Sequence, residues 1–175
     1  MDGSGTLTAA ESRAVAIARP ARHSLPVVVA SPHSGHDYPA DFVAAARLDP
    51  LALRRSEDAH VDALFAGVGA LGVPLIKALF PRAYLDPNRE AFELDPEMFV
   101  DRLPGYVNTR SPRVAAGLGT IPKVVAQGAE IYRGKLYFAD ALERIERLYS
   151  PYHAALRALA AEARAAFGHA VLLDA

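Results

Sequence analysis

The stretch PVVVASPHSG, residues 26–35, decides the fold class. Its first half is a short run of β-branched residues bounded by prolines, which predicts a buried strand over 26–31. His33, Ser34 and Gly35 follow at once, and their composition is that of a loop. A polar loop directly after a buried strand is where α/β sheets place their ligands, so we expect a site here.

Apolar periodicity and punctuating residues predict the other elements in the same way. Ser56 is a suitable N-cap for a helix that Gly72 ends, and Gly168 ends a longer helix near the C-terminus. Residues 90–133 are rich in proline and glycine and predict a long excursion of loops and short elements. We predict helices over 9–18, 41–47, 56–72 and 140–167, the last interrupted by Pro151, and further strands over 73–80, 83–86 and a buried 170–174.

Strands that alternate with helices indicate an α/β sheet with helical cover. The 175 residues are 51% apolar, which is enough for one globular domain. Pro151 leaves two possibilities for the last helix, either two abutting helices or one kinked helix.

Composition excludes several functional classes. With no cysteine, the chain has no disulfide, zinc finger, thiolate nucleophile or iron–sulfur cluster, so a metal would need His, Asp, Glu or carbonyl ligands. A net charge of −1 argues against nucleic-acid binding, and no apolar run is long enough for a membrane span. The first twenty residues scatter charges without the apolar core of a secretory signal, so we expect a cytoplasmic protein.

Three groups of residues are suited to chemistry. His33 after the first strand suits a metal ligand or a base, although a hydrogen-bonded loop histidine is as good an interpretation. Glu57 and Asp58 offer carboxylates, although acids in a first helical turn also simply favour the helix dipole. Around the third predicted strand, Arg82, Asp86, Asn88 and Arg89 suit carboxylate recognition or a plain surface ion pair.

Taken in order, five segments make this chain resemble the N-formylglutamate amidohydrolase family, from about residue 26 to the end. The segments are Ser31-Pro-His-Ser-Gly35, Asp58-Ala-His-Val61 with Leu64-Phe65, Arg82-Ala-Tyr-Leu-Asp-Pro-Asn-Arg89, Pro151-Tyr-His153 and Phe167-Gly-His-Ala-Val-Leu-Leu-Asp-Ala175. The family is similar to the zinc carboxypeptidase and aspartoacylase group. The resemblance implies a mixed, mostly parallel sheet covered by helices on both faces, of which this chain would be the N-terminal part.

The resemblance also implies an activity, the hydrolysis of N-formylglutamate to formate and glutamate in one route of histidine catabolism. It implies a divalent metal, with zinc first and cobalt or iron as alternatives, held by His33 and by Asp58 rather than Glu57. The substrate would be a small acyl-amino acid. Roles follow for five further positions: Asn88, Arg89 and Ser34 in substrate binding, and Arg82 and His60 in catalysis, where Arg82 would polarise the scissile carbonyl.

The end of the chain departs from the family pattern. In the family, the strand that ends in Leu-Asp-Ala is followed by His-Ser, which would supply a further metal ligand, and a glutamate far downstream would be the general base. This sequence stops at Ala175. We therefore expect an N-terminal extension over 1–25 and an amidohydrolase domain over 26–175 that is truncated at its C-terminal end.

Two other functions fit the same residues. A non-catalytic module could bind a carboxylate ligand at Arg82, Asn88 and Arg89 without turnover. A carboxypeptidase-like deacylase would keep the fold and act on another acylated substrate. Tight binding without product formation would indicate the first alternative, and assays of several acyl-amino acids would reveal the second. The sequence leaves the oligomeric state open.

Overall fold

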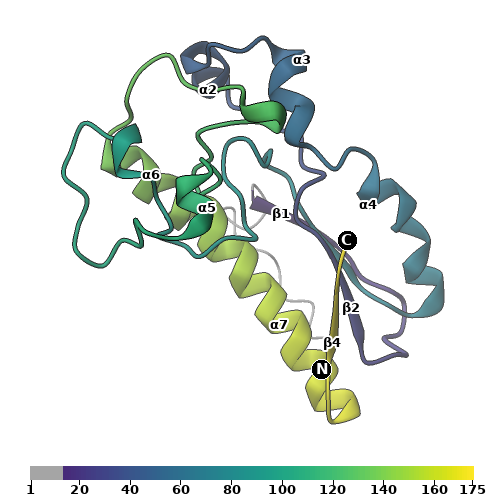
Figure 1. Cartoon of the computed structure of the whole chain (residues 1–175). Coiled ribbons are helices and arrows are strands. Elements are labelled where there is room, and N and C mark those ends of the chain that lie inside the picture. Colours follow the sequence, from purple (N-terminus) through teal and green to yellow (C-terminus); the bar gives the residue numbers. More distant parts are fainter. Residues whose placement is uncertain (1–13) are drawn as a thin grey trace.

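The computed structural model describes residues 14–175. Within them, four strands form one sheet in the order β1-β3-β2-β4 (Figure 1). β2 (Val27–Ser31) pairs in parallel with both β3 (Leu75–Ala78) and β4 (Val171–Asp174), whereas β1 (Val15–Ala18) pairs antiparallel with β3. The sheet is therefore mixed and mostly parallel, and the predicted strands over 26–31, 73–80 and 170–174 are confirmed.

The predicted helix over 9–18 is wrong where the structure describes it, and its first residues lie outside the described range. Val15–Ala18 is β1, and its register pairs Val15 with Ala78. Alanine has the highest helix propensity, but propensity is a weak guide, and a free edge of β3 that can bury Val15 outweighs it. Part of the expected N-terminal extension thus lies in the sheet.

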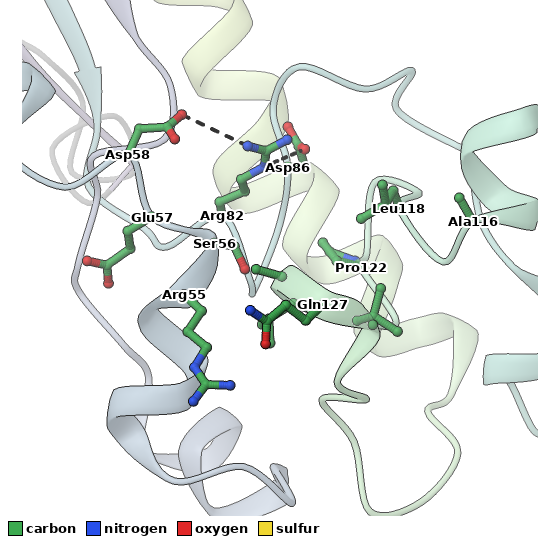
Figure 2. A pocket seen from close by; sticks show the side chains of 14 residues that line it. Arg55, Ser56, Glu57, Asp58, Arg82, Asp86, Ala116, Leu118, Pro122 and Gln127 are labelled. Atoms are coloured by element: carbon green, nitrogen blue, oxygen red, sulfur yellow. Dashed lines mark hydrogen bonds and ion pairs between the residues drawn. The ribbon is translucent and has the colours of Figure 1, made fainter.

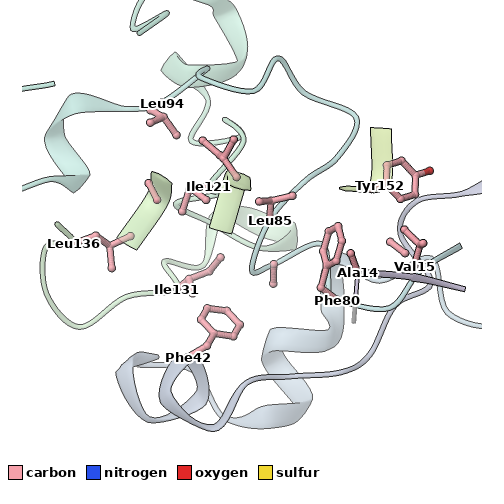
Figure 3. Packing of buried hydrophobic residues seen from close by; sticks show 14 of the residues in the cluster. Ala14, Val15, Phe42, Phe80, Leu85, Leu94, Ile121, Ile131, Leu136 and Tyr152 are labelled. Atoms are coloured by element: carbon pink, nitrogen blue, oxygen red, sulfur yellow. The ribbon is translucent and has the colours of Figure 1, made fainter. Parts of the chain in front are cut away.

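The predicted strand over 83–86 is also wrong, because this segment is a turn. The backbone amides of Tyr84 and Leu85 donate to the carbonyl of Pro81, and Leu85 is fully buried. The apolar residues of this segment are buried in the core that the surrounding loops share, and they do not form a strand. The same core, which includes Leu94, Ile121 and Ile131, holds together the long excursion over 90–133 that the sequence predicts (Figure 3).

The predicted helix over 56–72 is broken into pieces. The backbone at Glu57 is extended, α4 (Val61–Leu64) begins only after His60, and a 3-10 segment (Ala66–Leu71) leads to a left-handed Gly72. Ser56 ends a 3-10 turn and caps no helix. The shorter helices are α2 (Ala40–Ala45), α3 (Pro50–Leu53) and α5 (Pro112–Ala115).

The long C-terminal helix is one continuous run with a wider turn inside it. It consists of α6 (Phe138–Arg144), a π-helical turn (Ile145–Tyr149) and α7 (Ser150–Phe167). Pro151 lies at the start of α7, where its missing N–H is tolerated after the π-helical turn. Gly168 ends the helix in the left-handed conformation, as predicted.

Helical cover of the sheet is uneven, so the expectation of helices on both faces is not confirmed. α7 packs against β2 and β1 and buries Tyr152, Ala155, Leu159 and Ala163 (Figure 1). A smaller cluster on Val29 and Leu75 receives Phe65 and Val68. β4, predicted as buried, is the sheet edge, and its Val171, Leu172 and Leu173 are exposed. No helix within residues 14–175 is both long and apolar enough to cross a membrane.

Candidate active site

His33 lies between two carboxylates in the loop after β2. Its Nε2 lies 2.9 Å from Oδ1 of Asp86, and its Nδ1 lies 3.1 Å from Oδ2 of Asp58. The histidine is buried, with 7% of its surface exposed. A ring nitrogen bonded to a buried carboxylate fixes the tautomer and the orientation of the other nitrogen. The Nδ1 edge of His33 is therefore held toward Asp58.

Gly35 brings this loop close to the end of β3. A Cβ at Gly35 would lie 2.7 Å from the carbonyl carbon of Leu79 and would collide with the carbonyl oxygen of Phe80. Only glycine allows this approach of two backbones. The loop that carries His33 is thus placed directly against the segment that leads to Arg82.

Asp86 is the buried centre of the cluster. Its side chain is 3% exposed. Its carboxylate accepts hydrogen bonds from Nε of Arg82 at 3.0 Å and from the backbone N–H of Asn88 at 2.9 Å, and it lies 3.3 Å from Nη2 of Arg89. Burial by itself raises the pKa of Asp86, but the hydrogen bond from His33 and the two guanidinium groups outweigh it and lower the pKa overall. Asp86 is therefore a carboxylate that carries its charge inside the protein.

Asp58 presents its carboxylate to solvent at the mouth of the site. Its amide donates to the carbonyl of His33 at 3.1 Å, and its side chain is 45% exposed. Nη1 of Arg82 lies 3.9 Å from Oδ2 of Asp58. Arg82 thus bridges an exposed carboxylate and a buried one.

Glu57 turns away from this cluster. Its buried carboxylate accepts from the hydroxyl of Tyr38 at 2.6 Å and lies 3.0 Å from Nη2 of Arg54. Burial and the bond to Glu57 raise the pKa of the Tyr38 hydroxyl. Of the two neighbouring acids, the structure brings Asp58 to His33 and uses Glu57 to tie the 57–58 segment to the loop of Tyr38.

A pocket of about 380 Å³ opens beside the cluster. Figure 2 shows Asp58, Arg82 and Asp86 together at one end, with Leu118, Pro122 and Gln127 across the cavity. The apolar wall is completed by Ala116, Val124, Val125 and Ala126. The pocket therefore combines convergent charged groups with an apolar wall, as small-molecule sites do.

Asn88 and Arg89 lie behind the pocket lining and are engaged with the protein. Asn88 donates from Nδ2 to Oδ2 of Asp174 at 2.6 Å. Arg89 donates from Nε to the carbonyl of Leu118 at 2.9 Å, and its side chain is 13% exposed. The structure brings both residues to Asp86, and a substrate carboxylate would have to replace some of these partners.

The structure does not bring Ser34 or His60 into the pocket. Ser34 is buried, and its hydroxyl lies 2.9 Å from that of Ser31. His60 is exposed at the start of α4 with a left-handed backbone, φ 67°. Their predicted roles in substrate binding and catalysis stay predictions without support from a contact in the site.

The donor set fits part of a metal site. Across residues 14–175, no group of three or more His, Asp or Glu side chains is arranged to hold an ion. The imidazole of His33 and the carboxylate of Asp58 supply two ligands of types that zinc accepts, whereas catalytic zinc sites use three protein ligands. The predicted pair of ligands thus lies together, without a third.

Sequence reasoning missed the far wall of the pocket and one polar group on its near side. Ser56 lines the pocket, and its buried Oγ has no hydrogen-bond partner within the described residues. Gln127 has a left-handed backbone, φ 66°, in a Gln-Gly turn. The one available signal was this turn composition, which does not say what the turn faces.

Comparison with known proteins identifies the family of this chain. Residues 25–175 match the N-formylglutamate amidohydrolase family. The chain belongs to this family. No curated protein matches it. The resemblance inferred from the five segments is therefore confirmed at the level of the family.

Two solved structures show the same fold. The crystal structure of N-formylglutamate amidohydrolase from Ralstonia eutropha JMP134 is 40% identical in sequence, with a TM-score of 0.85 over 93% of this chain and 57% of that one. The gene product Atu2144 from Agrobacterium tumefaciens is 20% identical, with a TM-score of 0.66 over 95% and 57%, and shows the fold alone. This family member thus spans a little over half the length of both structures.

Proposed function

We propose that the intact protein hydrolyses the amide bond of an N-formyl or N-acyl acidic amino acid, such as N-formylglutamate, to give formate or another acid and the free amino acid. The observation that carries this proposal is the contact between His33 and Asp58, which lines the pocket, with Asp86 bonded to the other ring nitrogen of the imidazole. Family membership supports the reaction class.

A divalent metal, zinc first and cobalt or iron as alternatives, would be held in part by His33 and Asp58. When bound, it would supply a Lewis acid and a water nucleophile that is active near neutral pH. The two donors at 3.1 Å from each other support this proposal. Asp86 supports it further, because metal-binding histidines typically bond a carboxylate through the second ring nitrogen.

Arg82 is the proposed electrophilic group of the chain itself. Its guanidinium is partly exposed and lies between Asp58 and Asp86 at the edge of the pocket. A fixed cation at this place would stabilise the negative charge that develops on the oxygen of the scissile carbonyl. Asp86 holds Arg82 in position through Nε, which leaves the outer edge of the fork for the substrate.

Asn88 and Arg89 are the proposed partners of the substrate carboxylate. A guanidinium and an amide together match the planar shape and the charge of a carboxylate. Both follow Asp86 in the same turn, so a substrate held there would be oriented with respect to His33. His60 has no part in this proposal, because its side chain is exposed at the start of α4 and makes no hydrogen bond to the cluster among the described residues.

Substitution of the paired donors tests the proposal. We expect His33→Ala and Asp58→Ala to lower kcat/KM for formate release from N-formyl-L-glutamate by about 100-fold or more, because each removes a ligand and disturbs the other. His169→Ala, at an exposed histidine, is the matched control and should leave the rate unchanged. Wild-type rates in both site variants would refute the assignment.

A further inference from the structure

One helical run holds the backbone of the turn that carries Asp86, Asn88 and Arg89. Three of its side chains bond to carbonyl oxygens of residues 84–89. The bonds run from Arg144 Nη1 to Tyr84 O at 3.2 Å, from His153 Nε2 to Pro87 O at 2.9 Å, and from the Tyr149 hydroxyl to Arg89 O at 2.8 Å. We call Arg144, Tyr149 and His153 the helix clamp.

The π-helical turn explains how three residues at these spacings reach one segment. In a regular α-helix, residues five apart point about 140° away from each other, so Arg144 and Tyr149 would face different directions. The turn Ile145–Tyr149 lies between them, and its wider i→i+5 bonding brings a residue five positions on back to nearly the same face. Tyr149 and His153, four apart, already share a face.

The clamp is anchored rather than loose. Arg144 is buried, donates to the hydroxyl of Tyr132 at 2.8 Å and lies 4.0 Å over the ring of Tyr84. Within the described residues, its guanidinium makes no ion pair with a carboxylate, and its partners are one carbonyl, the Tyr132 hydroxyl and the neighbouring aromatic rings. The ring centroids of Tyr149 and His153 lie 4.2 Å apart. Such fixed donors set the positions of the carbonyls that they bond.

We infer that Tyr149 and His153, with Arg144 as anchor, are positioning residues for substrate binding: they hold the backbone on both sides of Asn88 and Arg89 and so aim the two carboxylate-binding side chains. The inference rests on the proposed function, because it assigns these side chains to the substrate. The polar atoms of Tyr149 and His153 bond to backbone carbonyls of the turn, so each acts through the turn and not on the substrate.

Two substitutions that each remove one hydrogen-bond donor test the clamp. In the intact protein, we expect Tyr149→Phe and His153→Phe to raise KM for N-formyl-L-glutamate about three- to tenfold with kcat within about twofold, because a shift of the turn weakens a contact made in ground and transition states alike. Tyr106→Phe and His169→Phe are the matched controls, at an exposed tyrosine and an exposed histidine elsewhere. Neither should change KM.

A double variant separates positioning from a general loss of stability. If Tyr149 acts through Arg89, then adding Tyr149→Phe to Arg89→Ala should raise KM no further than Arg89→Ala alone. An additive rise in the double variant, or an unchanged KM in both single variants, would overturn the inference.

Hydrogen exchange gives a readout that does not depend on activity. Peptides that span residues 84–89 should exchange faster in Tyr149→Phe and His153→Phe than in the wild type, because the carbonyls lose their fixed donors. Unchanged exchange there would overturn the clamp even if the wild type proved inactive. An inactive wild type with faster exchange in the variants would instead refute the proposed function and leave the clamp standing.

Discussion

Burial separates the two acids that contact His33. Asp86 is almost fully buried and bonded to two guanidinium groups, whereas Asp58 is nearly half exposed. The two acids lie at similar distances from the imidazole, but we expect them to contribute differently to stability. Removing one partner from a buried charge network leaves the other charges unpaired and out of reach of water, which destabilises the fold, whereas water compensates at an exposed position.

We expect Asp86→Asn to lower the free energy of unfolding at pH 7 by about 3 kcal/mol and Asp58→Asn by less than about 1 kcal/mol. Urea unfolding of the two variants beside the wild type measures both values. Equal losses would contradict the buried charge centre that the structure places at Asp86.

The pH dependence of this difference has a definite sign. The pKa of Asp86 is lower in the folded protein than its ordinary value, so its stabilising contribution is complete above about pH 4. It is lost as the pH falls through the folded-state value. The gap in stability between wild type and Asp86→Asn should accordingly narrow below about pH 4.

The sequence points to individual candidate residues of the site, but it does not predict the contacts between them. His33, Asp58, Arg82 and Arg89 are recognisable as site candidates because polar residues follow strand ends or resemble the family motifs. The bond between His33 and Asp86 joins residues 53 apart in sequence and depends on the turn that begins at Pro81, whereas the sequence predicts a strand over 83–86. A pattern of local residues does not contain such a contact.

Among the elements, those with a strong local signal were predicted and those set by tertiary contacts were not. β2, β3 and the long C-terminal helix carry dense apolar runs or a continuous apolar stripe. β1 was predicted as a helix because its partner strand is 60 residues away, and the helix at 56–72 fails where the side chains of Glu57 and Asp58 bond across the site. In both places, hydrogen bonds to a partner distant in sequence outweigh the local helix propensity.

The loop after β2 depends on a glycine that no other residue can replace. We expect Gly35→Ala to cost about 1–3 kcal/mol of stability and to reduce activity, because a Cβ there collides with the backbone at Leu79 and Phe80 and would push His33 from its carboxylates. Thermal unfolding and formate release measure the two effects. Gly134→Ala, where a Cβ meets nothing within 4 Å, is the control. Wild-type stability in Gly35→Ala would contradict the close approach.

At the scale of the whole molecule, the described residues form one four-stranded sheet whose edge strand reaches the candidate site. β4 lies at the sheet edge with exposed apolar side chains, and Asp174 at its end bonds Asn88. The chain spans 57% of the Ralstonia eutropha enzyme. The third metal ligand and the general base that the resemblance implies stay predictions.

The most direct test of the central claim is formate release from N-formyl-L-glutamate by the intact protein, with zinc or cobalt supplied and with a chelator added in a parallel reaction. The contact of His33 with Asp58, which lines the pocket together with Arg82, predicts steady formate release that the chelator abolishes and the metal restores. Release that persists undiminished under the chelator would contradict the metal assignment. The absence of formate under every metal condition would contradict the proposed reaction.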